Sequence, residues 1–158
     1  MTTSIPVKNR YFEDYQKGEV FEVGDYLVTR EEILDFASRY DPQPFHLDED
    51  AARSSIYGGL IASGWMTCSV MMRILVDGFI SPLASMGSPG VDEVRWLKPV
   101  RPGDRLRARI EVLDSRRSRS RPDRGVVHFR YEGVRQDGEV VLSMRGMGML
   151  RCRDAGHS

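Results

Sequence analysis

The feature that most constrains the fold is an alternation of apolar and charged residues in the second half of the chain. Between residues 105 and 112, every even position is apolar and every odd position is charged. This period of two is typical of a β-strand with one face on the core and one in solvent. Residues 127–132 repeat the pattern, and Asp137-Gly138 predicts a two-residue hairpin turn after them. The second half of the chain is therefore predicted to form long antiparallel strands.

A run of apolar residues precedes these strands. Residues 60–76 carry apolar side chains all round a helix rather than along one stripe, which predicts a buried central helix. Gly58-Gly59 end the loop before it, and the helix is about 25 Å long at the usual rise per residue. A buried helix followed by long strands indicates an α+β domain in which a curled antiparallel sheet wraps around the helix.

The first half predicts shorter elements. Residues 19–28 are predicted to form a strand. Thr29 and Glu32 form a capping box that starts a helix. Pro42 disfavours helical geometry before it, so that helix is predicted to end at Tyr40-Asp41.

The last strand carries an irregular pattern. Its apolar residues shift in phase from Leu142 and Met144 to Met147 and Met149, with Gly146 between them. A glycine at such a shift predicts a β-bulge.

Length and composition bound the class of protein. The 158 residues suit one domain with a single core, with an N-terminal arm at 1–10, the domain at 11–152 and a tail at 153–158. Lys+Arg and Asp+Glu both number 23, so the zero net charge gives no overall attraction to nucleic acid or an acidic membrane.

No apolar signal segment begins the chain, and polar residues interrupt its longest apolar run. We therefore expect a cytoplasmic protein without a membrane span. Two cysteines, Cys68 and Cys152, are too few for a disulfide framework or a metal site.

Two prolines hold an acid and a base at a fixed spacing in Tyr40-Asp41-Pro42-Gln43-Pro44-Phe45-His46. Each proline fixes its own φ and pushes the residue before it towards extended geometry, which predicts a stiff loop. A histidine titrates near neutral pH while a carboxylate beside it stays charged, so Asp41 and His46 could hold a water and move its protons. On this spacing alone, a turn cap and a surface histidine are the commoner explanation.

Four segments together resemble the MaoC-like dehydratase and (R)-specific enoyl-CoA hydratase family. They are Tyr11-Phe12-Glu13-Asp14 with Lys17-Gly18, the Asp-Pro-Gln-Pro-Phe-His motif of residues 41–46, Gly-Leu-Ile-Ala-Ser-Gly-Trp-Met at 59–66, and Val-Arg-Pro-Gly-Asp at 100–104. The resemblance covers residues 11–151 and implies a single hot-dog domain. Two positions depart from the family pattern: Gln43 stands where Asn is usual, and Ser63 stands where a His commonly precedes the helix glycine.

The resemblance implies addition of water to a trans-2-enoyl-CoA, or its removal from a 3-hydroxyacyl-CoA. Asp41 and His46 would be the catalytic pair, and which of them protonates C2 stays open. The Gly64 backbone N–H would stabilise the charge on the thioester oxygen, because unpaired donors and the helix dipole favour negative charge at a helix start. The missing side chain of Gly64 would let the ligand approach closely.

Ser69, Gln43 and Ser63 are further possible substrate contacts by the same resemblance. For Ser69, a hydroxyl bonded back to the helix backbone is an equal alternative. No metal and no separate cofactor is implied, since coenzyme A is part of the substrate. His128 lies on the polar face of its strand and His157 in the tail, so neither is a site candidate.

Five arginines lie between two predicted strands, at positions 116, 117, 119, 121 and 124. We interpret them first as a solvated hairpin loop and second as a grip for the phosphates of coenzyme A. The resemblance also implies a homodimer. The physics agrees, because the open edge of a curled sheet leaves backbone groups unpaired.

Two other functions stay open at this point. One is an acyl-CoA thioesterase of the same fold, against which the Asp-His segment argues. The other is a non-catalytic acyl-CoA-binding subunit, which the departures at Gln43 and Ser63 leave possible.

Overall fold

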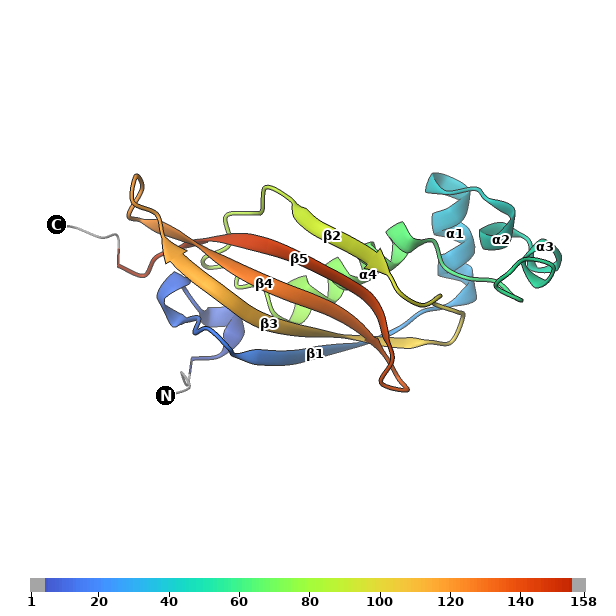
Figure 1. The fold of residues 1–158 in the computed structure, drawn as a ribbon, viewed down its shortest axis with the longest axis horizontal. Coiled ribbons are helices and arrows are strands. Elements are labelled where there is room, and N and C mark those ends of the chain that lie inside the picture. Colours follow the sequence, from blue (N-terminus) through green and yellow to red (C-terminus); the bar gives the residue numbers. More distant parts are fainter. Residues whose placement is uncertain (1–4, 155–158) are drawn as a thin grey trace.

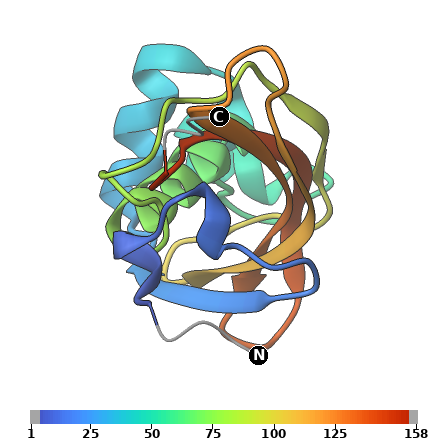
Figure 2. The same cartoon turned by 90° about the vertical axis from the view of Figure 1, so that its left-hand side faces the viewer.

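One antiparallel sheet of five strands curls around helix α4 in the computed structural model, which describes residues 5–154 (Figures 1 and 2). The strand order is β1-β3-β4-β5-β2, so β1 and β2 form the two edges. The strands are β1 (Val20–Leu27), β2 (Val91–Trp96), β3 (Arg105–Arg117), β4 (Arg124–Arg135) and β5 (Val140–Arg151). The predicted α+β plan, with a sheet around a helix, is confirmed.

The inner face of the sheet carries the core. Leu106, Ala108, Ile110 and Val112 of β3 are all buried, and their odd-numbered neighbours are more exposed. The predicted hairpin at Asp137-Gly138 joins β4 to β5, and Gly138 has a positive φ of 86° that a side chain would strain. The period of two therefore identified the core-facing residues correctly.

The bulge predicted at Gly146 is wrong. The pairing of β5 with β4 runs without a break from Arg145 through Gly146, and the irregularity in this pair lies at Gly133/Val134 instead. Leu142, Gly146 and Leu150 are all buried at even positions, so the inward phase does not change. A Cβ on Gly146 would lie 3.4 Å from the Tyr131 ring. This glycine therefore leaves room for the Tyr131 side chain and does not mark the inserted residue of a bulge.

The α-helices gather at one end of the sheet, except for α4, which runs along its inner face, and two short 3-10 helices, Val7–Asn9 and Phe12–Asp14, lie at the other end (Figure 1). The α-helices are α1 (Arg30–Tyr40), α2 (Pro44–Leu47), α3 (Glu49–Arg53) and α4 (Gly64–Gly78). The Thr29 hydroxyl accepts the Glu32 N–H at 3.2 Å, and α1 ends at Tyr40, both as predicted. Within residues 5–154, no helix has the length and apolar character needed to cross a membrane.

Helix α4 is less buried than its composition predicts. Its sheet-facing side packs in the core through Met66, Val70, Met71 and Ile74. On the other side, Trp65 is 61% exposed, Met72 48% and Val76 45%. The reason is geometric, because one curled sheet covers only one side of the helix (Figure 2).

The N-terminal arm is not loose from residue 5 onward. Val7–Asn9 forms a turn of 3-10 helix, and Arg10 is 3% exposed, with its guanidinium bonded twice to the Glu19 carboxylate at 3.0 Å. Near the other end of the chain, Arg153 forms an ion pair with buried Asp14. Both ends of the described chain are thus held by charge pairs. His157 lies outside the described residues.

Candidate active site

Asp41 caps the C-terminus of α1. Its own N–H donates to the Ala37 carbonyl at 2.9 Å, and Pro42 prevents the helix from continuing. The Gln43 side-chain amide donates to Asp41 Oδ1 at 2.6 Å. The proline-stiffened segment therefore holds the carboxylate at the junction of α1 and α2.

His46 lies on α2, a single helical turn with Pro44 at its first position, so this part of the segment is helical rather than a loop. Its Nδ1 lies 2.8 Å from the Ile61 carbonyl oxygen, and the residue is 4% exposed. A carbonyl oxygen only accepts, so Nδ1 carries a hydrogen in this contact. The free ring nitrogen, Nε2, lies 3.3 Å from Asp41 Oδ2.

The segment before α4 completes the site from a distant part of the sequence. Ser63 is fully buried, and its hydroxyl donates to Asp41 Oδ2 at 2.7 Å. The Ala62 N–H donates to the Val100 carbonyl at 2.8 Å. One extended segment thus contacts both members of the Asp41–His46 pair and the turn between β2 and β3.

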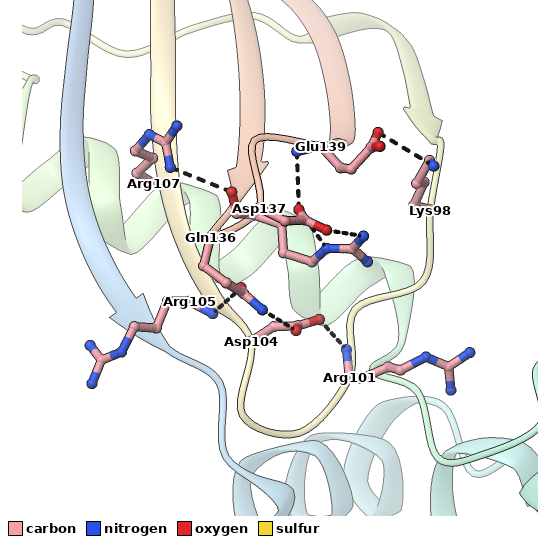
Figure 3. Close-up of polar contacts among 9 residues, drawn as sticks. Lys98, Arg101, Asp104, Arg105, Arg107, Gln136, Asp137 and Glu139 are labelled. Carbon is pink, nitrogen blue, oxygen red and sulfur yellow. Dashed lines mark hydrogen bonds and ion pairs between the residues drawn. The ribbon is translucent and has the colours of Figure 1, made fainter.

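That turn is itself fixed by a polar network at the β4–β5 hairpin (Figure 3). Asp104 accepts the Arg101 backbone N–H at 2.8 Å and the Gln136 side-chain amide at 2.9 Å. Asp104 is 9% exposed, so these bonds satisfy a largely buried carboxylate. Because Val100 lies in the same turn, the network supports the backbone that holds Ala62.

Gly64 is the first residue of α4, and its N–H has no hydrogen-bond partner among residues 5–154. The space beside its Cα is not open to a ligand, which corrects the expected reason for a glycine here. Trp96 fills that space: an added Cβ would lie 2.5 Å from the indole ring. The indole N–H also donates to the Gly64 carbonyl at 2.8 Å. No local pattern in the sequence pointed to Trp96, which lies 32 residues from Gly64.

The three further candidates have different surroundings. Gln43 and Ser63 both bond to Asp41, so their polar atoms support the carboxylate. The Ser69 hydroxyl donates to the Trp65 carbonyl at 2.9 Å, which is the local backbone bond of the alternative interpretation. His128 is exposed on the outer face of β4.

The arginine cluster lies far from the pair within one chain. It occupies the β3–β4 hairpin, at the opposite end of the sheet from α1 and α2 (Figure 1). The guanidinium of Arg117 donates to the Pro122 carbonyl at 2.9 Å, and Arg124 pairs with Asp123 at 3.0 Å. The predicted position of the cluster in a hairpin between two strands is confirmed.

The pKa of Asp41 reflects opposing effects. Partial burial raises it, whereas the hydrogen bonds from Gln43 and Ser63 and the charge of His46 lower it, and the net direction is down. Asp41 is therefore a carboxylate near neutral pH, and its Oδ2 faces both a hydroxyl donor and an imidazole nitrogen.

Comparison with known proteins places the chain in a family. The family described as MaoC like domain matches residues 14–130. The chain belongs to the MaoC-like family. Its MaoC-like relatives include mesaconyl-CoA hydratase of Cereibacter sphaeroides, which is 35% identical over 150 residues. The match covers 92% of this chain but 42% of that protein, so the chain spans less than half of this relative.

Solved structures agree on the fold. The crystal structure of the MaoC-like dehydratase from Rhodospirillum rubrum shares 40% sequence identity, with a TM-score of 0.85 over 92% of this chain and 99% of that one. A Mycobacterium tuberculosis protein with a double hotdog fold matches 98% of this chain and 48% of its own, at 20% identity and a TM-score of 0.78. This MaoC-like chain therefore has the hot-dog fold.

Proposed function

We propose that the protein adds water to a trans-2-enoyl-CoA, or removes it from a 3-hydroxyacyl-CoA, with Asp41 and His46 as its acid/base pair. The observation that carries the proposal is the 3.3 Å contact between Asp41 Oδ2 and His46 Nε2. Membership of the MaoC-like family, with a hydratase among the relatives, supports the reaction class.

The reaction needs two proton transfers. A water that contacts both Oδ2 and Nε2 loses a proton to one of them as its oxygen bonds to C3. The electron pair of the double bond moves towards C2 and the thioester carbonyl. The other group of the pair must carry a proton when the step begins; it gives this proton to C2, and the proton taken from water replaces it within the pair. Because the Nδ1 hydrogen of His46 is engaged by Ile61, only Nε2 is available for this exchange.

The charge that develops on the thioester oxygen needs a donor. We assign this role to the Gly64 N–H at the start of α4, which no described residue bonds and where the helix dipole favours negative charge. Loss of such a donor typically costs about 10²–10³ in rate. Coenzyme A is part of the proposed substrate, and the proposal includes no separate cofactor.

The test is loss of the conjugated absorbance of crotonyl-CoA and longer enoyl-CoAs on incubation with the protein. Asp41→Asn and His46→Gln should each abolish most turnover, while Asp35→Asn, an exposed acid on the same helix, should leave it unchanged. Near-normal turnover in either site variant would remove that residue from the mechanism. Release of free thiol would indicate a thioesterase, and binding without any reaction would indicate a non-catalytic subunit.

A further inference from the structure

A cavity of about 410 Å³ lies between the second half of α4 and the inner face of β4 and β5. Its walls are mainly apolar and include Met72, Leu75, Phe79, Phe129, Met144 and Leu150. Gly146 and Gly148 also line it, at consecutive inward positions of β5. At these two positions the cavity wall is the backbone of β5 without a side chain.

Four hydroxyl groups that line the cavity have no hydrogen-bond partner among residues 5–154: those of Tyr15, Ser81, Ser85 and Tyr131, of which Ser85 is exposed. Ser81 is fully buried, and its Oγ is a buried polar atom without a partner. Tyr15, which is 5% exposed, and Tyr131 also line the cavity, and neither hydroxyl is bonded to another described group. Burial raises the pKa of Tyr15 to about 12 and also raises that of Tyr131, so both are neutral donors.

An unpartnered hydroxyl in a protein interior is unfavourable unless something pairs with it, and the Ser81 Oγ is such an atom. The residues that line this cavity are all uncharged, so a bound carboxylate would have no compensating cation. The chemistry of the wall thus fits a ligand that is mostly apolar and carries a neutral oxygen function.

One face of α4 leads from the proposed active site to the cavity. Gly64, Cys68 and Met72 follow one another at a spacing of four, so they lie on one face of the helix. Edge strand β2 runs beside this face: Trp96 contacts Gly64 near the pair, and Val91 lines the cavity together with Met72. The distance from Gly64 to Met72 along the helix is about 12 Å.

We propose that this cavity receives the distal part of the acyl chain and selects chains that carry a neutral hydrogen-bonding group there, such as a hydroxyl or a ketone. Ser81, Tyr15 and Tyr131 are the specificity-determining residues. A plain alkyl chain would displace water from these hydroxyls and offer no hydrogen bond in return. A site built to bond a polar group of its ligand binds an analogue without that group more weakly. The inference rests on the proposed function and specifies its substrate class.

The first experiment measures binding rather than turnover. Saturated acyl-CoAs of four to twelve carbons are compared by calorimetry in three matched forms: plain alkyl, ω-hydroxy and ω-carboxy. At one chain length or more, the ω-hydroxy form should bind about tenfold or more tightly than the alkyl form. The ω-carboxy form should bind more weakly than the ω-hydroxy form at that length. Equal or tighter binding of the alkyl form at every length overturns the proposal.

The second experiment assigns the preference to residues. Ser81→Ala, Tyr15→Phe and Tyr131→Phe should each reduce the hydroxy-to-alkyl affinity ratio at the preferred length. Tyr11→Phe, which removes a hydroxyl outside the cavity, should leave it unchanged. An unchanged ratio in all three cavity variants overturns the assignment.

The two proposals fail in different ways. If the wild-type protein hydrates crotonyl-CoA but shows no hydroxy preference, only the inference about the cavity fails. If it shows the preference in binding but converts no enoyl-CoA, the hydratase proposal fails and the cavity remains a site for polar-tipped acyl groups.

Discussion

Asp41 receives a hydrogen bond on each carboxylate oxygen, from Gln43 on Oδ1 and from Ser63 on Oδ2. Its side chain is 18% exposed, so it is close enough to solvent to meet a substrate water. These bonds restrict the rotation of the carboxylate and stabilise its charged form. Ser63 departs from the usual family residue, and its hydroxyl positions the Asp41 carboxylate.

Ser63→Ala should lower kcat/KM by up to about 10²-fold, because Oδ2 loses the donor that orients it. The Ser63 bond lowers the pKa of Asp41, so its loss raises that pKa, and the acid limb of the pH profile should move to higher pH. Ser63→Thr keeps a hydroxyl and should restore the profile. The measurement is kcat/KM against pH, and an unshifted acid limb in Ser63→Ala would contradict the positioning role.

Trp96 complicates a direct test of Gly64. Any residue with a Cβ at this position, proline included, would clash with the indole, which lies 2.5 Å from the added atom. Gly64→Pro alone should therefore reduce stability as well as turnover, and it does not isolate the N–H.

Two double variants isolate the contribution of the Gly64 N–H: Gly64→Ala with Trp96→Ala, and Gly64→Pro with Trp96→Ala. Both variants relieve the clash, and only the second lacks the Gly64 N–H. A first-position proline is tolerated in helices, so thermal unfolding should be similar for the two. Turnover of crotonyl-CoA should be about 10²–10³ lower in the proline variant. Equal turnover would show that the N–H takes no part in the reaction.

Helix α1 connects edge strand β1 to the catalytic segment, and its start is stabilised locally. The Thr29 hydroxyl accepts the Glu32 N–H, and the Glu32 carboxylate in turn accepts the hydroxyl of Tyr26 in β1. The cap thus joins the strand to the helix whose C-terminus is capped by Asp41.

Thr29→Ala should lower the free energy of unfolding by ~1 kcal/mol, because one first-turn N–H loses its acceptor. Urea denaturation measures the change. Ser38→Ala, within the same helix, serves as the control and should not destabilise the protein, since alanine is the better helix former there. A Thr29→Ala protein as stable as the wild type would show that water replaces the cap at no cost.

At the scale of the whole molecule, the two edges of the sheet differ. Edge β2 contacts α4 through Trp96, which packs against Trp65. The two elements and the residue after β2 expose large apolar side chains: Trp65, Met72, Val76, Val91, Trp96 and Leu97. Exposed apolar side chains next to unpaired strand edges favour association. We therefore propose that a homodimer forms through β2 and α4, close to Gly64 and to Met72 and Val91 of the cavity wall.

Val76→Glu should shift the protein from dimer to monomer at micromolar concentration, because it places a charge in this apolar surface. Leu27→Glu, on the opposite edge strand, should leave the dimer intact. Sedimentation velocity separates the two outcomes. Turnover should fall with the dimer fraction if both subunits wall the substrate, and a stable, fully active wild-type monomer would refute the assembly.

Sequence alone predicted the parts of this protein that depend on near neighbours. The alternation in β3, the cap at Thr29, the end of α1 before Pro42 and the Asp137-Gly138 turn all follow from interactions within a few residues. The family resemblance added the hot-dog fold. It could not say which atoms of Asp41 and His46 meet, nor that Ser63 would join them.

Tertiary structure decided everything that depends on how the sheet curls. Ser63 reaches Asp41 across 22 residues, and Trp96 occupies the space beside Gly64 across 32. The same curvature exposes one side of α4 and turns Gly146 into a cavity wall instead of a bulge. Hydrophobic period indicates which face of an element turns inward, but the partner of each side chain depends on long-range packing, which local pattern does not encode.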